Sequence, residues 1–139
     1  MARNQALVVA AFAAIACSSG ALATSEAFGG YLNDDRAITV SLRTFRIEPQ
    51  ILHLKSGRPI VLRVSNDSGI AHDLTAAEFF ARAAMSSPDR AKVLNGRIAL
   101  GANQSAAVTI IPRSGHYPVK CSHPLHKIFG MTGTIVVDP

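Results

Sequence analysis

Apolar and polar residues alternate over most of the chain from residue 37 onward. Ile38, Val40 and Leu42 alternate with polar positions, which is the pattern of a strand with one buried face. Similar short runs follow, separated by clusters of Gly, Ser, Asn and Pro that are typical of turns. The pattern predicts strands at residues 38–42, 51–55, 59–65, 97–100, 106–111, 116–121 and 133–137. About seven or eight short strands in roughly 100 residues predict an all-β sandwich or barrel.

One segment departs from this alternation. Residues 75–85 are rich in alanine, and Thr75 and Glu78 have the spacing of a capping box, in which each side chain bonds the other residue's backbone N–H. We therefore expect one short helical insertion near residues 75–85, ended by the sequence Ser86-Ser87-Pro88.

The N-terminus has the pattern of a secretory signal peptide. Arg3 is followed by the apolar run 6–16 and by the small residues Ala21-Leu22-Ala23. The run is much shorter than the roughly 20 residues that a membrane-spanning helix needs. We expect cleavage after Ala23, export to the periplasm and no transmembrane segment.

The predicted organisation is therefore a signal peptide at 1–23, a lead-in at 24–36 and one domain at 37–139. An alternative is processing as a lipoprotein at Cys17, which follows Ala14-Ile15-Ala16, although the leucine usual in that motif is missing.

The charge of the chain is modest. The formal net charge is +5, and the Lys and Arg residues are scattered among the predicted strands instead of forming a basic stripe. We therefore expect a monomer that binds no nucleic acid, with the positive charge serving solubility or an acidic partner.

Cysteine usage points to a metal. If Cys17 leaves with the signal peptide, Cys121 is a lone thiol in an oxidising compartment, where thiols normally pair. An inert buried cysteine is one explanation, but His126 and Met131 lie in the same loop between two predicted strands. Thiolate, imidazole and thioether together suit copper that cycles between Cu(I) and Cu(II). His72, just after a predicted strand, can supply a second imidazole from the neighbouring end of the sandwich.

These residues lie in motifs that resemble the cupredoxins, the type 1 blue-copper family that includes azurin, plastocyanin and auracyanin. The motifs are FRIEPQILHLKSG (45–57), VSNDSGIAHDL (64–74), GHYPVKCSHPLHKIFGM (115–131) and the closing strand GTIVV. The Cys-x4-His-x4-Met spacing is similar to that of auracyanin. The resemblance implies a Greek-key sandwich that holds one copper ion. The implied ligands are His72, Cys121 and His126, with Met131 as a weak axial ligand.

Three histidines and one aspartate complicate this assignment. His123 also follows the cysteine and is a rival ligand, whereas His53 and His116 lie outside the motif and are expected to be ordinary strand residues. Asp73 stands where relatives often have an asparagine that ties the two ligand loops together. Because an ionised carboxylate accepts but does not donate hydrogen bonds, that tie is in doubt here.

Four protein ligands leave no open position for a substrate, whereas catalytic metal centres keep one. We therefore expect no enzymatic activity but transfer of single electrons between redox proteins. The apolar residues near His126 would form a docking patch if exposed, or would cap the core if they fold inward; they are Pro124, Leu125, Ile128 and Phe129.

Three other functions use the same residues. A periplasmic copper-delivery protein would have the same fold and ligands. An accessory to metal oxidation or uptake predicts carboxylates near the site, and only Asp73 qualifies. A Cys121–His123 nucleophilic pair would require an oxyanion hole and a substrate cleft, and nothing in the sequence indicates either.

Overall fold

The structure is a computed structural model, and it describes residues 36–124, 126 and 129–139. The expected signal peptide, its cleavage at Ala23 and the alternative at Cys17 lie outside the described residues. The same is true of Leu125 and Ile128 in the expected docking patch. No helix in the described part of the chain is long and apolar enough to cross a membrane.

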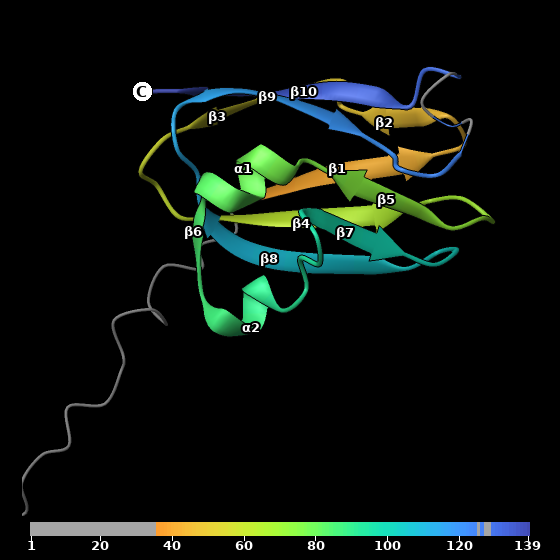
Figure 1. Ribbon diagram of the computed structural model, residues 1–139, viewed down its shortest axis with the longest axis horizontal. Coiled ribbons are helices and arrows are strands. Elements are labelled where there is room, and N and C mark those ends of the chain that lie inside the picture. Colours follow the sequence, from red (N-terminus) through yellow and green to blue (C-terminus); the bar gives the residue numbers. More distant parts are fainter. Residues whose placement is uncertain (1–35, 125, 127–128) are drawn as a thin grey trace, which may run out of the picture.

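Ten strands form two five-stranded sheets that face each other (Figure 1). The first sheet has the order β2 (Arg46–Glu48), β1 (Ala37–Arg43), β4 (Ile60–Asn66), β8 (Ser105–Ile111), β6 (Ala84–Met85). The second has the order β3 (Ile51–Lys55), β10 (Thr132–Asp138), β9 (Gly115–Lys120), β5 (His72–Thr75), β7 (Arg97–Leu100). The pairs β1–β4 and β3–β10 are parallel and the other pairs are antiparallel. The predicted all-β Greek-key sandwich is confirmed.

The alternating pattern builds the core between the sheets. In β4, Ile60, Leu62 and Val64 are buried while Arg63 is exposed, so successive side chains point to opposite faces. The same alternation in β9 buries Tyr117 and Val119 from the second sheet. All seven predicted strands are present within one or two residues of their predicted ends.

Three further strands, β2, β5 and β6, have only two to four residues each. They were not predicted because they are too short to show a period. In β5, moreover, three consecutive residues are buried, so no polar face alternates with an apolar one.

The predicted helical insertion is confirmed, but its capping box is wrong, and so is its end at Ser86-Ser87-Pro88, because the helix ends at Arg82 and strand β6 follows. Helix α1 spans Ala77–Arg82, and its N-cap is Ala76, which makes no side-chain cap. Thr75 is the last residue of β5, and its hydroxyl donates to Asp73 Oδ1 at 2.5 Å instead. Ser86 caps a second short helix, α2 (Ser87–Arg90), by accepting from the backbone N–H of Asp89.

Four connections gather at one end of the sandwich, on the right in Figure 1. They are β1–β2, β4–β5, β7–β8 and β9–β10. We refer to this end as the β9–β10 end, and the predicted metal ligands lie there.

Candidate metal centre

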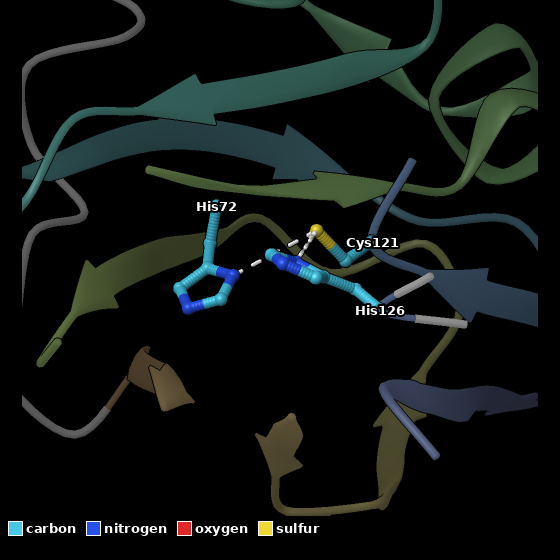
Figure 2. A group of neighbouring side chains, drawn as sticks. All are labelled: His72, Cys121 and His126. Atoms are coloured by element: carbon cyan, nitrogen blue, oxygen red, sulfur yellow. Dashed lines mark hydrogen bonds between the residues drawn. The ribbon is translucent and has the colours of Figure 1, made fainter. Parts of the chain in front are cut away.

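Three of the predicted ligands converge at the β9–β10 end (Figure 2). His72 is the first residue of β5, Cys121 directly follows β9, and His126 lies in the β9–β10 connection. Cys121 Sγ is 3.8 Å from His72 Nδ1 and 3.5 Å from His126 Nδ1. His72 and Cys121 are buried, whereas His126 is half-buried.

The strand register brings the two segments together. β5 and β9 are antiparallel neighbours, with Thr75 opposite Lys120. In an antiparallel pair the two chains run in opposite directions. Continuing the register from Thr75 back toward His72 therefore places the start of β5 beside the residues after Lys120, which are Cys121 and Ser122.

The β9–β10 connection folds back on itself through backbone hydrogen bonds. The N–H of Cys121 donates to the carbonyl of Met131 at 3.1 Å, and the N–H of Met131 donates to the carbonyl of His126 at 3.0 Å. Gly130, at φ 91°, supplies a left-handed backbone conformation that other residues rarely adopt. Met131 is fully buried directly before β10. One closed turn therefore holds Cys121, His126 and Met131.

The spacing of the donor atoms fits a first-row metal ion. Bonds of about 2.0–2.1 Å to histidine nitrogen and about 2.3 Å to cysteine sulfur, as in zinc sites, place nitrogen and sulfur about 3.5–3.8 Å apart for tetrahedral to trigonal angles. The observed 3.5 and 3.8 Å agree with this range. A thiolate with two imidazoles and a nearby methionine is a donor set that suits copper.

The hydrogen bonding of His72 supports the same conclusion. Its Nε2 is buried without a hydrogen-bond partner in the described part of the chain, and its Nδ1 faces only the weak sulfur acceptor of Cys121. A buried polar side chain normally finds better partners. A metal ion at Nδ1 would replace this weak contact, with the ring proton on Nε2.

Burial sets the protonation of the free site. It lowers the pKa of His72, an effect strengthened by the neighbouring His126 and His123, and it raises the pKa of Cys121. The metal-free site therefore holds a neutral imidazole and a protonated thiol. Since a thiolate is the metal ligand, metal binding would release the thiol proton.

A second group of possible donors shares Cys121. Asp73 Oδ2 is 4.0 Å from Cys121 Sγ and 3.8 Å from Nε2 of His123, the rival ligand. Asp73 is already engaged, since it accepts from Ser122 N at 2.9 Å, from Ser122 Oγ at 2.6 Å and from Thr75 Oγ1 at 2.5 Å. This engagement favours His72 and His126 over Asp73 and His123 as partners of Cys121.

The same hydrogen bonds show that Asp73 can link the two segments that carry the predicted ligands His72 and Cys121. Asp73 in β5 is joined to Ser122, next to Cys121, and in every bond the carboxylate is the acceptor. An ionised aspartate can therefore make this tie. Burial alone would raise the pKa of Asp73, but the hydrogen bonds from Ser122 and Thr75 outweigh it and hold the pKa below its ordinary value.

The two histidines outside the motif are strand residues, as predicted. His53 in β3 and His116 in β9 are exposed and lie on either side of Val136 of β10. Neither belongs to a group of possible metal donors in the described part of the chain.

Phe45 is a neighbour of the centre that sequence reasoning missed. It lies in the β1–β2 connection with φ 58° and is 39% exposed. Its ring centroid is 5.3 Å from that of His126, edge to face, and 5.0 Å from that of Phe129. An aromatic residue between Arg43-Thr44 and Arg46, in the segment between the predicted strands 38–42 and 51–55, was the available signal.

The inward alternative for Phe129 is wrong, because this side chain is 59% exposed. Pro124 is exposed as well. Phe45 and Phe129 pack together beside His126, and Pro124 lies two residues before His126 in the chain; we call these three exposed residues the apolar rim.

The fold and the donor cluster thus describe a β-sandwich with one cysteine and two histidines at one end that could hold a metal ion. Residues 36–138 match the family model described as copper binding proteins, plastocyanin/azurin family. The chain belongs to this family and is a cupredoxin, which confirms the resemblance.

Solved structures agree on the fold. Dithionite-reduced auracyanin from Roseiflexus castenholzii is similar with a TM-score of 0.57 and 19% identity, over 75% of this chain and 98% of that one. Auracyanin A from Chloroflexus aurantiacus, described as a "blue" copper protein, has a TM-score of 0.50 and 17% identity, over 73% of this chain and 99% of that one. A search of curated proteins found no match.

Proposed function

We propose that this cupredoxin is a periplasmic type 1 copper protein that carries single electrons between redox proteins and catalyses no reaction of its own. His72, Cys121 and His126 would be the strong ligands of one copper ion, and Met131 the weak axial one. The observation that carries the proposal is the approach of two histidine Nδ1 atoms to the sulfur of Cys121, at 3.8 and 3.5 Å. The N-terminal sequence pattern supports the periplasmic location.

When bound, copper would accept one electron from a reduced partner and release it to an oxidised one. The protein's part is to keep the donors in place. His72, Cys121 and Met131 are each at most 1% exposed, so water is excluded from three sides of the centre. The closed β9–β10 turn fixes Cys121 relative to Met131, so little rearrangement accompanies the change of charge. Four protein donors leave no open coordination position for a substrate.

Partners would dock on the apolar rim. His126 is the most exposed of the three converging side chains, and Phe45 and Phe129 pack beside it. A small exposed apolar surface suits a short-lived complex, because such interfaces are small. An electron would then pass through the imidazole of His126, the least buried of the three side chains.

The two loop histidines provide a matched test of the ligand set. In copper-loaded protein, His126→Ala should lose or radically change the thiolate-to-copper absorption band, because it removes a ligand at 3.5 Å from the sulfur. His123→Ala should keep the band, because His123 faces Asp73. The reverse result would make His123 the ligand and overturn the assignment.

Copper delivery would use the same ligands, so the rate of copper loss separates the two functions. An electron carrier retains Cu(I), and the burial of His72, Cys121 and Met131 supports retention. We expect Cu(I) protein mixed with a competing chelator to lose its metal much more slowly than it exchanges electrons with a small redox reagent. Complete transfer of Cu(I) within the time of electron exchange would favour delivery instead.

A further inference from the structure

Asp73 places a buried carboxylate beside the cysteine ligand. It is 1% exposed, and its Oδ2 lies 4.0 Å from Cys121 Sγ. Apart from the weak contact with the Cys121 thiol, its hydrogen bonds come from uncharged donors of Ser122 and Thr75. The carboxylate charge is therefore solvated by the protein but not neutralised by a direct cationic hydrogen bond.

The one arginine joined to this network acts at a distance. Arg97 Nη1 donates to Ser122 Oγ at 3.0 Å, and the same hydroxyl donates to Asp73 Oδ2. Arg97 is exposed, so solvent screens much of its charge. His123, with Nε2 3.8 Å from Asp73 Oδ2, is partly exposed on the other side.

The charge of the centre differs between the two copper states. With Cu(II), the thiolate of Cys121 and the carboxylate of Asp73 bring the sum to zero; with Cu(I), the sum is −1. An asparagine at residue 73 would give +1 and zero instead. Uncompensated charge is costly in a poorly solvated interior, so the carboxylate favours the oxidised state.

We propose that Asp73 is a charged positioning residue that both ties β5 to the Cys121 loop and lowers the reduction potential of the copper centre, with Arg97 offsetting part of this effect through Ser122. This inference rests on the proposed function, because it requires the copper ligands assigned above. The affected step is Cu(II) plus one electron from a redox partner giving Cu(I), with Asp73 keeping its charge throughout.

Asp73→Asn tests the charge without removing the tie. With its oxygen in the place of Oδ1, the amide can still accept from Ser122 N and Thr75 Oγ1, and the hydroxyl of Ser122 can rotate to accept from the amide NH₂. The readouts are the reduction potential, the ratio of Cu(I) to Cu(II) affinity, the visible spectrum, and the unfolding of the metal-free protein.

We expect Asp73→Asn to keep the thiolate band and to raise the affinity ratio at least about tenfold, which is about 59 mV for a one-electron couple. Asp67→Asn is the matched control, because it removes a carboxylate from the exposed part of the β4–β5 connection and should change the ratio far less. Asp73→Ala, which removes both charge and tie, should alter the spectrum as well.

The outcomes are distinguishable. No thiolate band in wild type would overturn the proposed function and this inference with it. An intact band with a ratio no more shifted in Asp73→Asn than in Asp67→Asn would overturn this inference alone. If Asp73→Asn does not fold, Arg97→Gln decides: a lowered affinity ratio supports the inference, and an unchanged one overturns it.

Discussion

The interior of the sandwich and its β9–β10 end bury different kinds of residue. The core between the sheets is apolar, whereas all four buried polar side chains in the described part of the chain fall within residues 66–73: Asn66, Ser68, His72 and Asp73. This stretch is the end of β4, the β4–β5 connection and the start of β5. The apolar interior stabilises the fold, and the polar segment shapes the metal centre.

The polar segment is held by specific hydrogen bonds. Asn66 Nδ2 donates to the carbonyls of Ile70 and Gly101, both at 2.8 Å, and its Oδ1 accepts from the N–H and hydroxyl of Ser68. Asn66 thus fastens the β4–β5 connection to the β7–β8 connection. Among the buried side-chain nitrogen and oxygen atoms of the described residues, only His72 Nε2 lacks a hydrogen-bond partner. The unsatisfied imidazole therefore belongs to a side chain assigned as a metal ligand.

Leu62→Ala should have the largest effect on stability and almost none on the metal centre. Leu62 is fully buried in β4, and deleting its side chain should lower the free energy of unfolding by about 2–5 kcal/mol. Denaturant unfolding of the metal-free protein measures this loss, and a Cu(II) titration checks that the folded protein keeps its thiolate band. The matched control is Ile51→Ala, because Ile51 is 56% exposed and should change stability little. Equal losses in the two variants would contradict the described core.

Asn66→Ala should lower both the stability of the fold and the affinity for copper. Removing the amide takes one hydrogen bond from each of the carbonyls of Ile70 and Gly101 and leaves the buried N–H of Ser68 without its acceptor, which should cost about 1–3 kcal/mol. Because the β4–β5 connection leads directly to His72, copper affinity should fall as well. Unfolding and copper titrations on the same samples test both effects. If Asn66→Ala loses stability but binds copper as tightly as Leu62→Ala, the polar segment does not position the ligands.

Met131→Leu should tune the centre with little loss of stability. Leucine keeps the volume and apolarity of this buried position, so the cost should be below about 1.5 kcal/mol. A thioether binds Cu(II) weakly, so the thiolate band should persist while the reduction potential shifts. Absorption and redox titration measure both. A variant that binds no copper, under conditions that saturate wild type, would show methionine to be an essential ligand.

Substitution of Asp89, which lies far from the metal centre, should have the smallest effect on stability. Asp89 accepts from Lys92 Nζ at 3.0 Å and from Ser86 Oγ at 2.9 Å; burial alone would raise its pKa, but these bonds hold the pKa below its ordinary value. A carboxyl with a lowered folded-state pKa stabilises the protein above its unfolded-state pKa, and this stabilisation is lost as the pH falls through the folded-state pKa.

Asp89→Asn should therefore lower the free energy of unfolding at neutral pH by less than about 1 kcal/mol. The difference from wild type should shrink in acid, and urea unfolding over a pH series measures it. A difference that grows as the pH falls would contradict the sign of the shift.

The core was predictable from sequence because buried residues alternate with less buried ones over all seven residues of β4 and over the second half of β8. Strand β5 was not predictable, because three consecutive residues of it are buried and no alternation shows in the sequence. Its pairing with β9 involves the single residue pair Thr75–Lys120, which depends on how the sheet assembles. That pairing joins Asp73 to Ser122, so the acceptor role of Asp73 became clear only in the structure.

The loop ligands were predictable for a different reason. Cys121, His126 and Met131 are close in sequence, so one turn can collect them. Phe45 is distant in sequence, and no local pattern connects it to His126. Its place beside the centre follows from how the β1–β2 and β9–β10 connections pack.

The most direct test of the type 1 copper centre is a Cu(II) titration of the metal-free protein, followed by visible absorption and electron spin resonance, with Cys121→Ser as the control. We expect an intense thiolate-to-copper band that saturates at one copper per chain, a type 1 resonance spectrum, and neither feature in a Cys121→Ser protein that still folds. A colourless Cu(II) wild-type complex, or an unchanged band in Cys121→Ser, would contradict the account.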